Sequence, residues 1–242
     1  MTPVHVVVFA ALLPAIILFL YIRYQDRAQP EPASWLLRGF AYGCFSVFVS
    51  LLFSGPLTSL VGTGLNLSSL FNALFTAFGL AAIPEELAKL LMLWLLLRRN
   101  PYFDEHLDGV VYAVCVGLGF ASVENVMYLF QSEDWASLAV ARALFAVPGH
   151  FFFAVLMGYY YSLAHFRHHR LRNSFMALAA PIVAHGIYDG LLMTEEAMKN
   201  QLPDAFMALF TLTFLLFCNE LRKLGKRRIS DLIELDRRNG LR

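Results

Sequence analysis

Seven apolar segments separated by short polar connections constrain this chain more than any other feature. Each segment is near or above the roughly 20 residues that an α-helix needs to cross a bilayer. In the whole chain 58% of the residues are hydrophobic and 15% are charged, whereas about one quarter are charged in a typical soluble domain. The sequence therefore predicts an all-α, polytopic membrane protein. The expected spans are about 4–22, 35–54, 68–97, 108–130, 137–165, 174–193 and 203–221.

Lysine and arginine fall in alternate connections between these segments. The basic connections are 23–34, 98–107, 166–173 and the tail 222–242, and the other three hold only Lys199 between them. Because basic loops stay on the cytoplasmic side, we expect the N-terminus outside, the C-terminus in the cytoplasm and seven spans.

The two ends of the chain carry further expectations. Segment 4–22 lacks a basic start and a small-residue cleavage site, so we expect a retained span and not a signal peptide. Tail 222–242 is either a short amphipathic helix on the inner leaflet or a solvated tail. Three scattered cysteines in apolar segments are typical of buried side chains and argue against a disulfide framework.

Polar side chains within the spans are the second unusual feature. A charge at the centre of a spanning helix costs roughly 2.5–3.5 kcal/mol on insertion scales, and such residues are functional candidates by default. We therefore expect them to face one another or water, in one layer in the middle to outer half of the membrane. They are Glu85, Glu86, Lys89, Glu124, Asn125, Arg142, His150, His185 and Asp189.

The stretch AAIPEELAKLLMLWLLLRR (81–99) holds three of these charges. Lys89 follows Glu85 by four residues and Glu86 by three, so it can neutralise either carboxylate on one helix face. Two adjacent carboxylates do not both ionise cheaply in a low dielectric, which makes the pair a candidate acid–base unit.

Helical spacing also pairs His185 with Asp189, whose carboxylate can orient the imidazole. Prolines at 84, 148 and 181 stand within four residues before Glu85, His150 and His185. Because proline interrupts the helical hydrogen bonds, we expect kinks that open space for water beside these groups.

Other features in the spans have an ordinary structural interpretation. Arg142 stands alone near the outer end of its span, where we expect it to snorkel. The phenylalanines of HFFF (150–153) and the tyrosines of GYYYS (158–162) indicate lipid contacts and an interfacial aromatic belt. RHHR (167–170) lies in a short basic loop, and we give a metal-binding role for it low weight.

Taken together, the motifs resemble the PrsW family of intramembrane proteases, which is distantly similar to the CAAX prenyl endopeptidases. The resemblance covers about 80–192, nearly half of the chain. It rests on Glu-Glu-x-x-Lys, then Phe-x-x-x-Glu-Asn, then one histidine in each of two later spans. In this chain the residues are Glu85, Glu86, Lys89, Phe120, Glu124, Asn125, His150 and His185, with Asp189.

The resemblance implies a hydrolase, an endopeptidase that cleaves single-span membrane proteins such as anti-sigma factors on the extracytoplasmic side. It implies a multi-pass protein of the bacterial plasma (inner) membrane, with the lipid bilayer and a protein substrate as partners and no nucleic acid. The expected organisation is one transmembrane domain (1–221) with a catalytic core at about 68–193, followed by the basic tail.

Residue roles follow from the same resemblance. Glu85 and Glu86 would carry the catalytic carboxylates, one of them activating water and then protonating the leaving amine. His150 and His185 would position water or stabilise the oxyanion. The supporting residues are Lys89, Glu124, Asn125 and Asp189.

The sequence leaves the cofactor open. Glu86, His150 and His185 suit a three-ligand zinc site with an open position, although no HExxH is present. A metal-free mechanism uses the same residues and is slightly favoured, because Lys89 already balances the carboxylate charge. No cofactor is certain, and zinc is the candidate.

Two other functions remain open at this point. Buried Glu, His and Asp chains also form proton relays, so a proton-coupled transporter or channel is the alternative, although the chain shows no internal repeat of the kind transporters often have. A membrane scaffold without catalytic activity is the third hypothesis. The substrate, its cleavage position, the oligomeric state and the choice of base between Glu85 and Glu86 are open.

Overall fold

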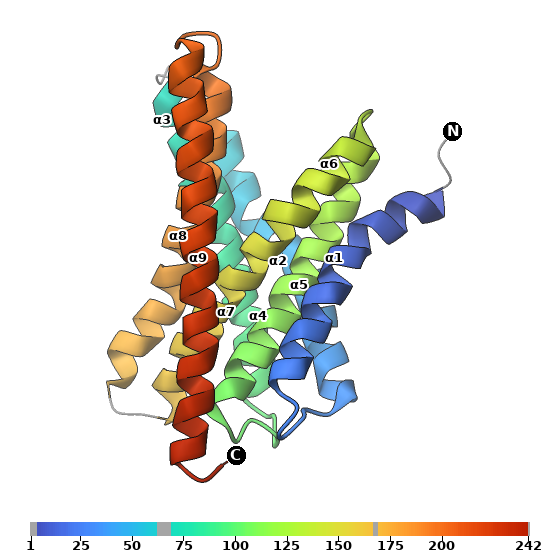
Figure 1. Ribbon diagram of the computed structural model, residues 1–242, viewed down its shortest axis with the longest axis vertical. Coiled ribbons are helices and arrows are strands. Elements are labelled where there is room, and N and C mark those ends of the chain that lie inside the picture. Colours follow the sequence, from blue (N-terminus) through green and yellow to red (C-terminus); the bar gives the residue numbers. More distant parts are fainter. Residues whose placement is uncertain (1–3, 62–68, 167–168, 242) are drawn as a thin grey trace.

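A computed structural model describes residues 4–61, 69–166 and 169–241. All regular structure in these residues is helical (Figure 1), which confirms the all-α prediction. In chain order the elements are α1 (Val4–Gln25), α2 (Ala33–Val61), α3 (Ser69–Phe75), η1 (Thr76–Ala82), α4 (Ile83–Leu97), α5 (His106–Gln131), α6 (Trp135–Ala141), η2 (Arg142–Ala146), α7 (Val147–Phe166), α8 (Arg170–Met198) and α9 (Asp204–Arg238).

Six helical stretches in the described residues are long and apolar enough to cross a membrane by length and composition. The remaining predicted span, 68–97, is helical from Ser69 to Leu97 but is divided among α3, η1 and α4 and carries the charges of 85–89. The start of α1 and the end of α9 lie toward opposite ends of the bundle (Figure 1). The seven-span topology and its orientation stay predictions.

Helix α5 is the centre of the bundle and is buried along most of its length against α1, α2 and α7. Glycines let these backbones approach. A β-carbon on Gly119 of α5 would lie 2.1 Å from the carbonyl oxygen of Phe40 in α2, and one on Gly158 of α7 would lie 2.4 Å from that of Gly109. Small residues are the usual means of close helix packing in membranes, and here they fix α2 and α7 on α5.

Two π-helical turns, η1 and η2, end directly before α4 and α7. In each, the residue that follows the turn donates its N–H to the carbonyl five residues earlier. Pro84 and Pro148 come next, and proline crowds the preceding turn and donates no hydrogen bond. A wider turn relieves this crowding. The irregularity predicted beside Glu85 and His150 is therefore present as π turns, whereas α8 continues as one helix through Pro181.

Helix α9 continues without interruption to Arg238, so residues 222–238 of the predicted tail are helical. Its carboxyl-terminal part buries Ile229, Leu232 and Asp236 against the bundle. The Asp236 carboxylate accepts hydrogen bonds from the N–H groups of His106 and Leu107, each at 3.0 Å. It thereby caps the amino terminus of α5, where helix N–H groups lack partners.

Two further expectations concern loops and cysteines. Helix α2 extends to Val61, so the first part of the predicted loop 55–67 is helical, and the rest of that loop lies outside the described residues. Arg167 and His168 of the RHHR motif also lie outside them. All three cysteines are free, as predicted, but only Cys115 is buried, whereas Cys44 and Cys218 are partly exposed.

Candidate active site

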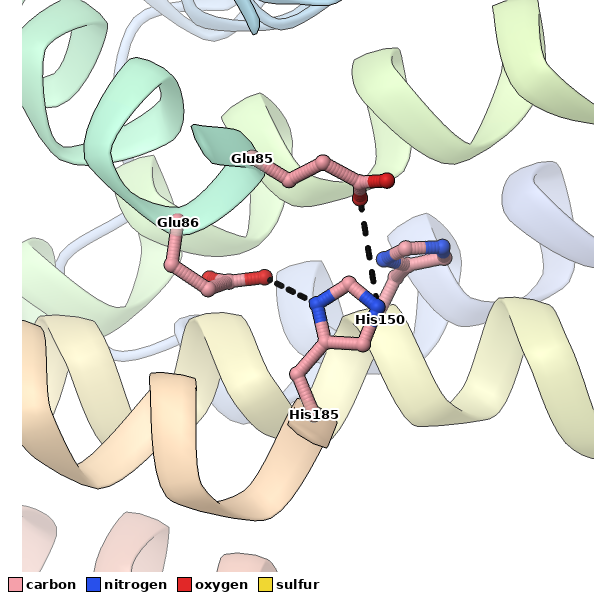
Figure 2. Close-up of side chains that lie close together, drawn as sticks. All are labelled: Glu85, Glu86, His150 and His185. Atoms are coloured by element: carbon pink, nitrogen blue, oxygen red, sulfur yellow. Dashed lines mark hydrogen bonds and ion pairs between the residues drawn. The ribbon is translucent and has the colours of Figure 1, made fainter. Parts of the chain in front are cut away.

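The polar residues predicted to share one layer come together between α4, α5, α7 and α8, and Figure 2 shows Glu85, Glu86, His150 and His185 among them. Glu86, at the start of α4, lies 2.9 Å from His185 of α8, measured from Oε1 to Nδ1. Lys89 Nζ lies 3.1 Å from His150 Nδ1 of α7. His150 Nε2 in turn lies 2.9 Å from Glu124 Oε2 of α5. The prediction of a single polar cluster is thus confirmed.

Glu86 is the fully buried carboxylate of the pair. Its Oε1 accepts a hydrogen bond from Lys89 Nζ at 2.8 Å and one from His185. Its Oε2 has no hydrogen-bond partner within the described part of the chain. An orphaned buried carboxylate oxygen is costly, so this atom is a candidate ligand for a group that enters the site.

Glu85 has a different environment. Its Oε2 lies 3.3 Å from Lys89 Nζ and 3.9 Å from His185 Nε2. Its side chain retains 15% exposure, against 0% for Glu86. Glu85 lines a cavity of about 350 Å³ together with His150 and His185, whereas Glu86 does not. Of the two carboxylates, only Glu85 meets the space that water and substrate can enter.

His150 has a carboxylate on one ring nitrogen, and His185 has one on each. His150 Nε2 faces Glu124, and the ammonium group of Lys89 faces its Nδ1. The ammonium donates, so Nδ1 accepts and the ring proton lies on Nε2, bonded to Glu124. His185 Nε2 lies 3.3 Å from Asp189 Oδ2, as the four-residue spacing predicts. These carboxylates fix the two ring orientations.

Arg142 is part of the site, and the prediction that it snorkels alone is wrong. Its Nη2 donates to Glu124 Oε2 and its Nε donates to Asn125 Oδ1, both at 2.6 Å. Asn125 also donates to the carbonyl of Ala11 in α1. The π turn η2 begins at Arg142, and its guanidinium also stacks over Tyr128 at 4.2 Å. In the sequence, Arg142 was a single charge in an apolar segment, which marked it as unusual. The sequence did not show that its partners lie on α5.

Aromatic rings line the polar cluster. This differs from the lipid contacts predicted for the phenylalanines of HFFF. Phe151 is 0% exposed and Phe153 is 1% exposed, so the expected lipid contacts are wrong for both. Phe153 stacks on His185 with ring centroids 4.8 Å apart and planes 18° apart. Lys89 Nζ lies 3.9 Å from the ring centroid of Phe120, a cation–π contact. These rings exclude water from one side of the charged groups.

Comparisons with known proteins identify the family of this chain. Residues 31–218 match the family model described as PrsW family intramembrane metalloprotease. This chain belongs to the PrsW family. It is 36% identical to a protein named Protease PrsW of Clostridioides difficile (strain 630), over 76% of this chain and 78% of that protein. Proteins of the same name from Geobacillus kaustophilus and Bacillus subtilis (strain 168) are 34% and 32% identical, each over 77% of this chain and over 80% and 82% of their own lengths.

No solved structure matches the chain significantly. The predicted family, a peptidase activity and a multi-pass membrane protein are nevertheless established by the PrsW matches and by the apolar helices. The family supports a protein in the membrane as the substrate.

A metal is implied by the PrsW family description, and the residues present fit one. One ligand atom from each of Glu85, Glu86, His150 and His185 lies within 4.8 Å of the others. Two imidazoles with carboxylates suit zinc. This group contains the predicted set Glu86, His150 and His185, and Glu86 also carries the orphaned oxygen Oε2. Lys89 competes for the same atoms, so a cation there must displace its ammonium group.

Proposed function

We propose that this PrsW protease hydrolyses a peptide bond of a single-span membrane protein, such as an anti-sigma factor, with Glu85 as the general base. The observation that carries the assignment is the different exposure of the pair, since Glu85 lines the cavity and Glu86 does not. The bacterial relatives support placement in a bacterial plasma membrane, with cleavage on the extracytoplasmic side.

The cavity beside Glu85 measures about 350 Å³, and its walls include apolar side chains from α6, α8 and α9, such as Leu138, Leu192 and Phe214. The peptide groups of an intact helix are hydrogen-bonded within the helix. We therefore propose that a spanning substrate unwinds locally before its peptide bond reaches Glu85.

The chain's own residues then act in sequence. Glu85 accepts a proton from water as the oxygen attacks the carbonyl carbon, and it returns that proton to the amine as the C–N bond breaks. His150 and His185 position the water and the oxyanion. Glu124 and Asp189 hold the two rings, and Lys89 balances the carboxylates. No serine or cysteine lines the described cavity, in agreement with attack by water.

We further propose zinc at Glu86, His150 and His185. When bound, it would supply Lewis acidity toward the scissile carbonyl and its water. The family description and the orphaned Glu86 oxygen favour this over the metal-free mechanism that the sequence slightly favoured. It also separates the roles of the pair, with Glu86 as ligand and Glu85 as base.

The test compares protein termini in membranes from cells with wild type, Glu85→Gln, Glu86→Gln or the control Glu133→Gln at equal abundance. Glu133 is exposed and outside the cavity. New termini at the outer membrane boundary are expected with wild type and control only. Zinc measured on the purified proteins should be retained in Glu85→Gln and lost in Glu86→Gln. Cleavage by Glu85→Gln at the wild-type rate would refute the base assignment.

The alternative of a proton-coupled transporter has its own assay. Proton flux in protein-loaded liposomes without substrate would support it, and no feature of the cavity requires it. Flux that survives in Glu85→Gln and Glu86→Gln would show that these two residues do not carry the protons.

A further inference from the structure

A second group of buried carboxylates lies where the α1–α2 connection meets the start of α5. Asp26, Glu105 and Asp108 are each 0% exposed, and Glu31 is 4% exposed. Asp108 and Glu124 are 16 positions apart on α5, which is about 24 Å along a helix axis. The group is therefore separate from the active site, at the opposite end of α5.

The three fully buried carboxylates converge. One carboxylate oxygen from each of Asp26, Glu105 and Asp108 lies within 4.8 Å of the other two. Carboxylates are seldom buried unless a partner compensates the charge. Like charges repel more strongly here than in water, because the surroundings have a lower dielectric constant.

Backbone groups hold these side chains in place. Asp108 Oδ2 accepts hydrogen bonds from the N–H groups of Asp104 at 3.1 Å and Glu105 at 2.7 Å. Glu105 accepts from the N–H of Asp108, which completes a capping box at the start of α5. Asp26 Oδ2 accepts from the N–H of Glu31 at 3.0 Å. The geometry of the group is thus set by the backbone and not by the carboxylates' own repulsion.

One carboxylate oxygen of this cluster accepts no hydrogen bond. Asp108 Oδ1 is buried and has no hydrogen-bond partner among the residues the structure describes. Nearby, Arg23 Nη1 donates to the backbone carbonyl of Glu31 at 2.8 Å. An orphaned acceptor amid excess negative charge indicates a missing positive partner.

We propose that Asp26, Glu105 and Asp108 bind a hard divalent cation, Mg²⁺ or Ca²⁺. All-oxygen, anionic donors are the ligands these ions prefer, at about 2.0–2.1 Å for Mg²⁺ and 2.3–2.6 Å for Ca²⁺. Ligand oxygens on opposite sides of Ca²⁺ are then about 4.6–5.2 Å apart and those of Mg²⁺ about 4.0–4.2 Å apart, so oxygens that lie within 4.8 Å of one another are close enough to share either ion. The cation joins the end of α1 to the start of α5.

The test uses the full-length protein, purified in detergent and freed of metal with a chelator. Thermal unfolding is followed while MgCl₂ or CaCl₂ is added, with KCl keeping the ionic strength constant. At 100 times the dissociation constant, the midpoint should rise by about 5–10 °C. The rise should persist in Glu86→Gln, because the active site is not involved. No rise with either ion would overturn the proposal.

Asp108→Asn gives the decisive comparison. The amide oxygen still accepts from the two backbone N–H groups, but the charge is lost. The variant should lose the response to cation, and its cation-free midpoint should equal or exceed that of the wild type because repulsion is relieved. Asp104→Asn is the matched control, since Asp104 is an exposed carboxylate in the same connection, and it should respond as the wild type does.

A full cation response in Asp108→Asn would refute the assignment. If that variant does not fold, Asp26→Asn tests the same loss of response. A wild type that is stabilised on lowering the pH from 8 to 6 but not by either ion would show that protons neutralise the group, which also refutes the cation site.

Discussion

Lys89→Met tests how the active site balances its charge. Lys89 Nζ lies 2.8 Å from Glu86 Oε1 and 3.3 Å from Glu85 Oε2, and the side chain is 3% exposed. At an effective dielectric constant of 20 the two attractions are about 6 and 5 kcal/mol, before the cost of desolvation is subtracted. Removal of one partner from a buried ion pair costs about 3–5 kcal/mol. We therefore expect a metal-free variant to unfold about 6–20 °C below the wild type.

Zinc should reverse much of that loss. Without the ammonium group, Glu86 Oε1 and His150 Nδ1 are open to a cation. Lys89→Met should bind zinc more tightly than the wild type and recover stability when zinc is added, while cleavage of substrate remains impaired. The assays are thermal unfolding in detergent with and without zinc, together with measured zinc content.

The matched control is Lys199→Met, because Lys199 also pairs with a glutamate three residues away, Glu196, but both side chains are exposed. Exposed pairs contribute about 0–1 kcal/mol, so its midpoint should stay close to that of the wild type. If Lys89→Met is as stable as this control without metal, or binds zinc more weakly than the wild type, the charge balance proposed for the site is incorrect.

Three further outcomes are expected. Arg142→Gln should lower stability by about 1.5–3 kcal/mol and reduce cleavage, because Glu124 loses a charged hydrogen bond at 2.6 Å; unchanged unfolding and kinetics would exclude this role. Gly186→Ala should cost about 1–3 kcal/mol, since the new β-carbon would lie 2.2 Å from Phe78 of η1, whereas Gly55→Ala, with no atom within 4 Å, is the neutral control. A zinc chelator should abolish cleavage of a reconstituted substrate, and zinc but not Mg²⁺ should restore it; activity that survives complete zinc removal would favour the metal-free mechanism.

Contacts within one helix were the predictable part of the site. Glu85, Glu86 and Lys89 meet, and His185 meets Asp189, because the helical repeat alone brings residues three or four positions apart onto one face. The depth of each polar residue within its span also predicted the common layer. Such inferences need no knowledge of which helices are neighbours.

Contacts between helices were the part that sequence reasoning missed. The guanidinium of Arg142 reaches α5, and nothing in its own segment specifies that direction. Phe151 and Phe153 have the composition of lipid-facing residues, and only the surrounding helices make them buried. Asp236 caps α5 from 130 positions away in the chain. In a bilayer, lipid-facing and bundle-facing surfaces are both apolar, so hydrophobicity alone does not distinguish them.

The π turns also set the direction in which α4 and α7 present their side chains. A π turn closes its hydrogen bond over five residues instead of four, so each residue of η1 turns the chain by less than the roughly 100° of an α-helix. Phe78 of η1 packs against Gly186 of α8, and Glu85 lies at the start of α4. If η1 wound as a regular α-helix, composition, hydropathy and every motif letter would be unchanged, and both glutamates would still be turned away from the histidines.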